Sequence, residues 1–100
     1  MKKYGKQDDN HNDIAKAFEQ CGCSVQDLSM VGDGCPDMII GFMGHTIPIE
    51  VKNGELPKSK TKLTTDQEKW HSKWRGTVVT VFCVMGAIEL INTLRKNGRV

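Results

Sequence analysis

The stretch over residues 34–52 constrains the fold more than any other part of the chain. It contains two apolar, β-rich runs, Met38-Ile39-Ile40 and 46–51, separated by the glycine-containing pair Met43-Gly44. Two such runs around a short turn are typical of a β-hairpin. We therefore predict two antiparallel strands whose register is set by a two-residue turn at Met43-Gly44. Pro48 cannot donate a ladder hydrogen bond, so we expect a bulge or an unpaired edge at that point.

Three charged residues fall at the open end of this hairpin. The predicted register places Asp37 opposite Glu50, about 5 Å apart at Cβ, and the alternation of strand side chains places Glu50 and Lys52 on one face. Two carboxylates this close repel unless a cation lies between them, and Mg²⁺ is commonly held by one or two carboxylates and water. The Val51 carbonyl offers a third oxygen, and the Lys52 ammonium can hold a water or balance charge on a phosphate. The same residues are also compatible with the solvent-facing ends of an ordinary hairpin.

The order of several short motifs resembles a known nuclease family. The motifs are Gly34-Cys35-Pro36-Asp37 followed by Glu50-Val51-Lys52, the earlier segments Asp8-Asp9-Asn10-His11 and 22–29, and the later Thr64-Thr65-Asp66-Gln67. This series resembles the VRR-NUC (virus-type replication-repair nuclease) family of the PD-(D/E)XK superfamily, in its small stand-alone phage and prophage form. The resemblance runs from about residue 8 to about residue 94. It implies an α/β, restriction-endonuclease-like core with a short mixed β-sheet flanked by helices.

The resemblance also implies an activity and the residues that carry it. The chain would be a Mg²⁺- or Mn²⁺-dependent DNA endonuclease, with the metal on Asp37, Glu50 and the Val51 carbonyl and with Lys52 beside it. In the family an acidic residue of the first helix leans towards the metal, and Asp13 aligns with it, although the family commonly carries Glu there. An acid in the first turn of a helix is equally explained by the helix dipole. The family's Gln faces the active site and aligns with Gln67.

Composition and spacing predict the remaining elements. The expected elements are a helix that begins near Asp9 or Asn10 and ends at Gly22, a strand over 24–29, a helix from Thr64 or Thr65 to Gly76, a central strand over 77–83 and a helix over 87–96. Thr64 and Gln67 fit a capping box, which is a second explanation of that Gln. Trp70 and Trp74 share one face of their helix, and we expect them to pack in the core.

A basic segment follows the hairpin. Lys58, Lys60 and Lys62 alternate with small polar residues in what we expect to be a flexible loop. Most charge runs are simply solvated, but beside a phosphodiester site such lysines are suited to contact DNA phosphates without reading sequence. The net charge of the whole chain is only +2, so any basic surface must be local.

The length of 100 residues is enough for one small domain, expected over residues 8–100 after a mobile segment over 1–7. No apolar run is long enough to span a bilayer, and no apolar signal core follows the basic start. We therefore expect a cytoplasmic protein, in the cytoplasm of the host cell if the chain is phage-encoded. The four cysteines include no Cys-x-x-Cys pair, which argues against a zinc site.

The small family members resemble Holliday-junction resolvases that act as homodimers, which implies branched DNA as substrate. A small core and the need for two cuts in a four-way junction also favour a two-fold dimer. Five apolar residues are expected to cluster around the hairpin and to include the contact surface: Met30, Val31, Met38, Phe42 and Met43. The alternatives are a non-catalytic DNA-binding module with a nuclease fold and a monomeric flap or single-strand nuclease. A sequence-reading restriction enzyme is disfavoured because no separate recognition domain is visible.

Overall fold

The computed structural model describes residues 10–100, so the expected mobile segment over 1–7 lies outside the described residues. The elements, in chain order, are α1 (His11–Gln20), β1 (Ser24–Asp27), β2 (Met38–Phe42), β3 (His45–Val51), α2 (Lys58–Thr61), α3 (Thr65–Lys73), β4 (Val79–Val81) and α4 (Val84–Asn97). None of the helices within 10–100 has the length and apolar character required to cross a membrane.

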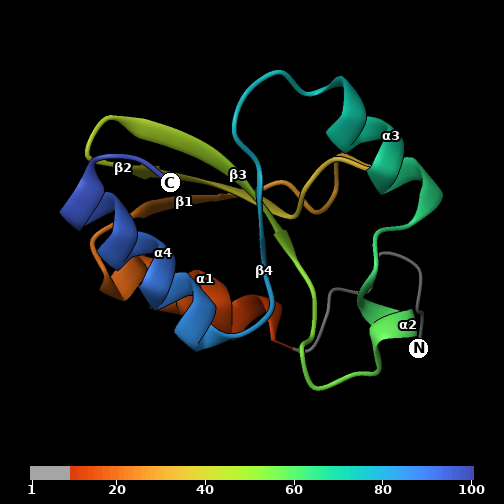
Figure 1. The fold of residues 1–100 in the computed structure, drawn as a ribbon, viewed down its shortest axis with the longest axis horizontal. Helices are drawn as coiled ribbons and strands as arrows, with labels where there is room; N and C mark the ends of the chain where they lie inside the picture. The colour runs from red at the N-terminus through yellow and green to blue at the C-terminus, as the bar shows by residue number, and fades with distance from the viewer. Residues whose placement is uncertain (1–9) are drawn as a thin grey trace.

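The four strands form one mixed sheet in the order β1-β2-β3-β4. β2 is antiparallel to both β1 and β3, whereas β4 runs parallel to β3. Figure 1 shows α1 and α4 side by side against the sheet, with α3 and the single turn of α2 at the other end of the molecule. The predicted class, a small α/β domain with a short mixed sheet flanked by helices, is confirmed.

The hairpin has the predicted register. Phe42 pairs with His45, which leaves Met43-Gly44 as the two-residue turn. Both turn residues have positive φ, +50° and +83°, as a type I′ turn requires. Met38 pairs with Ile49 at the other end, so continuing the same register by one residue sets Asp37 opposite Glu50.

Of the two alternatives expected at Pro48, the bulge is wrong, because the β2–β3 register continues unbroken through its pairing with Ile39. The other alternative, a locally unpaired edge, is confirmed on the side of β3 that faces β4. Antiparallel pairs alternate between hydrogen-bonded and non-hydrogen-bonded positions. Counted from the tight turn, Pro48 falls at a non-hydrogen-bonded position, so its nitrogen is directed away from β2. β4 begins to pair with β3 only at the next residue, Ile49. The missing N–H therefore interrupts neither ladder.

The core lies between one face of the sheet and the helices α1 and α4. Alternation along β3 sends Ile47, Ile49 and Val51 into it, as predicted. The buried apolar residues of the core are Ile14, Ala17, Phe18, Cys23, Met38, Ile40, Ile47, Ile49, Val51, Val81, Ala87, Leu90, Ile91 and Leu94. Glu50 and Lys52 project to the opposite face, where α3 covers them.

Two expectations about the second half of the chain need correction. The strand predicted over 77–83 is shorter, Val79–Val81, and it lies at the edge of the sheet rather than in its centre. A run of residues with high β-propensity indicates side chains that suit a pleated, partly buried surface. It does not indicate how many strands lie beside that run in the sheet. The basic segment expected as a loop forms one helical turn over Lys58–Thr61 before it returns to extended backbone at Lys62.

The five apolar residues expected to cluster around the hairpin are dispersed instead. Met38 is fully buried in the core, while Met30 and Val31 are exposed in the loop before β2. Met43 is exposed at the turn, the far end of the five-residue strand β2. At about 3.3 Å per residue these exposed side chains are separated by roughly the length of the strand and form no shared patch.

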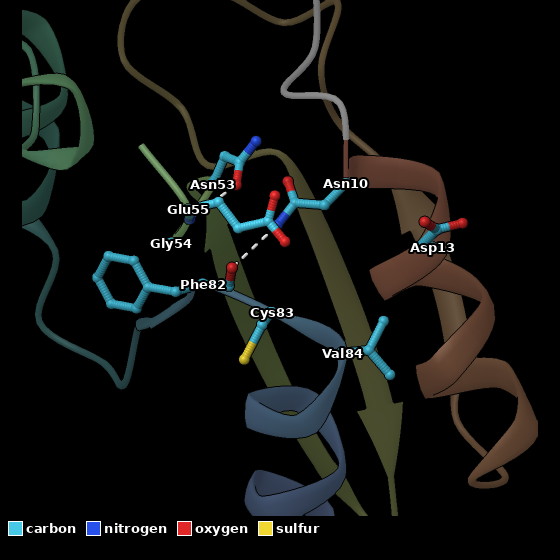
Figure 2. Close-up of a pocket in the computed structure, with 8 residues that line it drawn as sticks. All are labelled: Asn10, Asp13, Asn53, Gly54, Glu55, Phe82, Cys83 and Val84. Carbon is cyan, nitrogen blue, oxygen red and sulfur yellow. Dashed lines mark hydrogen bonds between the residues drawn. The ribbon is translucent and has the colours of Figure 1, made fainter. Parts of the chain in front are cut away.

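The start of α1 is attached to the ends of β3 and β4 by Asn10. Asn10 occupies the N-cap position, as the predicted start of the helix near Asp9 or Asn10 indicates, but its side chain makes no capping hydrogen bond to the helix. Its Nδ2 donates instead to the carbonyls of Lys52 and Phe82, each at 3.0 Å. Figure 2 shows the bond to Phe82. One amide thereby joins three elements that are distant in sequence.

We predict that Asn10→Ala lowers the free energy of unfolding by about 1–3 kcal/mol, the ordinary contribution of two hydrogen bonds. Denaturant unfolding followed by circular dichroism measures this change. Asn12→Ala is the matched control, because Asn12 is exposed on the same helix, and it should be close to neutral. Equal stability of the two variants would contradict the tethering role of Asn10.

Candidate active site

The buried face at the end of β3 carries a carboxylate and an ammonium joined by one amide. Glu50 is 1% exposed and Lys52 8% exposed. Gln67 of α3 donates from Nε2 to Glu50 Oε2 at 3.0 Å, and its Oε1 accepts from Lys52 Nζ at 2.8 Å. Buried charges are costly unless they are hydrogen-bonded or paired. The Gln67 amide supplies a hydrogen bond to one oxygen of Glu50 and another to the Lys52 ammonium.

Gln67 is fixed in place by the start of its own helix. The Thr64 hydroxyl accepts from the Gln67 N–H at 3.2 Å, and Gln67 Oε1 accepts from the Thr64 N–H at 2.9 Å. This reciprocal pair is the predicted capping box. An amide oxygen has two lone pairs, so Oε1 can cap the helix and hold Lys52 together.

A glycine allows α3 to approach the loop before β2. Gly34 has φ of +81°, and a Cβ at this position would collide with the main-chain carbonyl of Asp66 in the first turn of α3. Any larger residue would push the helix start away from the sheet. The close approach is what brings Gln67 over Glu50 and Lys52.

Asp37 completes the open end of the hairpin. Its Oδ2 accepts from the Val51 N–H at 2.7 Å, and its side chain is 22% exposed. In a strand the N–H and C=O of one residue point to the same side. The Val51 carbonyl is therefore directed to the side on which Asp37 lies. Asp37, Glu50, Lys52 and Gln67 come together in space as the sequence predicts.

Two histidines also belong to this region. His11 is part of the motif Asp8-Asp9-Asn10-His11, but the sequence assigned neither histidine to the site. His11 is 4% exposed at the start of α1, with Nε2 3.7 Å from Asp27 Oδ1 and Nδ1 4.0 Å from Asp37 Oδ1. His71, one turn after Gln67 on α3, has Nε2 3.9 Å from Glu50 Oε1. The spacing of four residues between Gln67 and His71 was the available signal, because residues i and i+4 share a helix face.

The electrostatics of the region affect two neighbouring groups. Burial, followed by the positive charge of Lys52, lowers the pKa of His71, which favours a neutral imidazole at pH 7. Burial, followed by the negative charges of Glu50 and Asp37, raises the pKa of Cys35. The Cys35 thiol therefore stays protonated and is a poor nucleophile.

The structure places Asp13 apart from these residues. Asp13 is exposed on α1 and lines a hollow with Asn10, Asn53, Gly54, Glu55, Phe82, Cys83 and Val84 (Figure 2). Across residues 10–100, no group of three or more His, Cys, Asp or Glu side chains is arranged to hold a metal ion. The structure thus does not group Asp13 with Asp37 and Glu50 as three acidic ligands, and the helix dipole is sufficient to explain its position. The assisting role of Asp13 stays a prediction.

The predicted DNA-contacting lysines are exposed. Lys58 and Lys60 lie on α2, and Lys62 directly follows it. Their exposure leaves all three ammonium groups accessible to a large ligand.

Comparison of the chain with models of protein families, with curated proteins and with solved structures finds no match.

We predict that Lys52→Gln raises the pKa of His71, because it removes the positive charge that helps to lower it. An NMR titration of the His71 ring without divalent metal measures the shift. Lys69→Gln, at an exposed position two residues before His71, should leave the pKa in place. An unchanged pKa in Lys52→Gln would assign the effect to burial alone.

The same pKa has a consequence for stability. Folded His71 binds a proton less readily than the unfolded chain, whose histidine titrates near 6.5. The unfolded state therefore takes up more protons as the pH falls below that value, and this histidine should lower stability there. Replacement by Gln should reduce the loss of stability between pH 7 and the lowered pKa, as measured by denaturant unfolding at several pH values.

Proposed function

We propose that this protein is a Mg²⁺- or Mn²⁺-dependent endonuclease that hydrolyses phosphodiester bonds in DNA, on a restriction-endonuclease-like core. The observation that carries the proposal is the grouping of Asp37, Glu50 and Lys52 at the open end of the hairpin, with Gln67 bridging the latter two. The order of motifs in the sequence supports the same conclusion.

The chemistry of the donors fits a hard divalent cation. Two carboxylates, from Asp37 and Glu50, and the Val51 carbonyl supply oxygen ligands, the type that Mg²⁺ prefers. Mg²⁺ usually keeps several waters and needs only one or two carboxylates, so the set is sufficient without Asp13. When bound, the metal would supply an activated water and polarise the scissile phosphate.

The side chains of the protein have separate tasks in this proposal. Asp37 uses Oδ2 to accept the Val51 N–H, and its Oδ1, which lies 4.0 Å from His11 Nδ1, would contact the cation. Lys52 is positioned to hold a water or to balance negative charge on the phosphate. Gln67 orients both Glu50 and Lys52, and it is a positioning residue unless substrate displaces its amide.

The proposal extends to branched DNA and to a homodimer. Resolution of a four-way junction requires two cuts on opposing strands, and a two-fold dimer presents two equivalent sites. The alternatives are a monomer that nicks flaps or single strands and a DNA-binding module without catalysis. The basic segment alone is compatible with either alternative, whereas the carboxylate pair favours an enzyme.

We predict that Asp37→Asn and Glu50→Gln each abolish Mg²⁺-dependent cleavage of four-way, flap and linear DNA. Both substitutions keep an oxygen acceptor, so the bonds from Val51 and Gln67 can persist and the fold should survive. Asp33→Asn, at an exposed loop position, is the control and should retain activity. Full cleavage by either site variant, assayed on labelled oligonucleotides, would refute the proposed metal site. Binding without cleavage in the wild type would favour the non-catalytic module.

We predict that replacing Lys58, Lys60 and Lys62 together by Ala weakens DNA binding and flattens its salt dependence. The slope of the logarithm of the binding constant against the logarithm of the salt concentration should become shallower by about 0.9 for each duplex-DNA phosphate that the variant no longer neutralises. Fluorescence anisotropy at several salt concentrations in EDTA gives the slope. Lys16→Ala, exposed on α1, should leave it unchanged, and an unaltered slope in the triple variant would show that these lysines are merely solvated.

A further inference from the structure

The two tryptophans of the chain stack on each other outside the core. Trp70 lies on α3 and Trp74 at its C-cap, with ring centroids 4.7 Å apart and planes 19° apart. Trp74 is 42% exposed, and of the α3 residues, all of which the structure describes, none is buried. The expectation that these rings pack in the core is therefore wrong. Large aromatic side chains that are exposed to solvent are typical of binding surfaces.

The stack is held in a fixed orientation. The Trp74 indole N–H donates to the Thr77 carbonyl at 3.0 Å. Gly76 passes close to the same indole, where a Cβ would lie 3.1 Å from Nε1. Trp70 also makes an edge contact with the His71 ring, at 5.8 Å between centroids. A surface ordered before binding loses little entropy when a ligand arrives.

The segment that carries the stack is positively charged, which indicates the kind of ligand. Residues 58–76 contain six basic and two acidic residues, whereas the rest of the chain contains eight basic and ten acidic residues. Lys69, Lys73 and Arg75 are next to the tryptophans in the sequence, whereas the other basic residues of the segment belong to α2 or directly follow it. An aromatic stack within a positively charged segment complements a polyanion that carries flat rings. A second copy would bring the same positive charge to the stack and is disfavoured by repulsion.

We propose that the Trp70–Trp74 stack binds an unpaired nucleobase of a DNA strand whose phosphates contact the surrounding basic residues. The identity of the strand as DNA rests on the proposed function. Bases inside a duplex are already stacked, so a ring on the protein gains most from a base that has no partner.

The position of the stack connects it to the candidate active site. Gln67, at the start of α3, contacts Glu50 and Lys52, and His71 lies 3.9 Å from Glu50. Trp74 follows Gln67 by seven residues, about 10 Å along a helix. A base held there lies one or two nucleotides from the carboxylates. The stack would thereby favour substrates with an unpaired nucleotide close to the cleaved bond.

Tryptophan fluorescence provides a direct test, because both tryptophans of the chain are in the stack. The wild-type protein is titrated in EDTA with oligothymidylate and with an abasic strand of equal length. We expect quenching by oligothymidylate and clearly tighter binding than to the abasic strand. Trp74→Leu should lower the affinity for oligothymidylate by about five- to 150-fold, the range of base–aromatic stacking, and remove the difference between the strands.

Control variants separate stacking from folding and from charge. Trp74→Tyr should keep the preference for the strand with bases. Met85→Ala, at an exposed apolar position on α4, should bind as the wild type, because the helix α4 lies away from α3 (Figure 1). The salt slope of Trp74→Leu should match the wild type, because the phosphate contacts remain.

Equal binding of the two strands by the wild-type protein would overturn the proposal. So would a change in tryptophan emission with protein concentration in the absence of DNA, since that would place a second copy on the stack. The outcome is independent of the nuclease proposal. A preference for bases without Mg²⁺-dependent cleavage refutes only the enzyme, and cleavage without that preference refutes only the stack.

Discussion

The pairing of β2 with β3 determines the position of almost every functional group in this protein. A two-residue turn fixes the register, and alternation then divides β3 into two faces. Ile49 and Val51 enter the core with α1 and α4, while Glu50 and Lys52 are directed to α3. A shift of one residue would exchange these faces and bury charge in the apolar core. The hairpin therefore specifies the fold and the candidate site through the same hydrogen bonds.

The contact between α3 and the sheet is polar, which distinguishes it from the apolar packing of α1 and α4. Gln67 is hydrogen-bonded to two buried charged groups, and the close approach at Gly34 replaces the interlocking of apolar side chains. Such a contact is stabilised by hydrogen bonds and contains few apolar packing interactions. Loss of any one hydrogen-bonding side chain should therefore weaken it. The same helix carries the Trp70–Trp74 stack outside the apolar core. It thus joins a buried polar site to an exposed aromatic surface.

Local sequence patterns were reliable where short-range physics decides the outcome. The turn at Met43-Gly44 follows from the distance between two apolar runs, and the cap at Thr64 follows from its spacing to Gln67. Patterns were unreliable where burial depends on what else is nearby. Trp70 and Trp74 have the spacing of residues on the buried face of a helix. Their helix, α3, nevertheless contacts the sheet through the polar residue Gln67 near its start. Pro48 is tolerated because it lies at a non-hydrogen-bonded position of the β2–β3 pair. Composition does not reveal this position.

By itself, the sequence determined the hairpin, its register, the order of helices and strands apart from the single turn of α2, and the grouping of Asp37, Glu50 and Lys52, because all of these depend on residues close together along the chain. The tertiary structure alone decided that β4 is an edge strand, that Asn10 joins α1 to two strand ends, and that His11 and His71 approach the carboxylates. These contacts join segments tens of residues apart. Their geometry depends on how the helices dock on the sheet, which is set by the summed packing of the core and not by any local pattern.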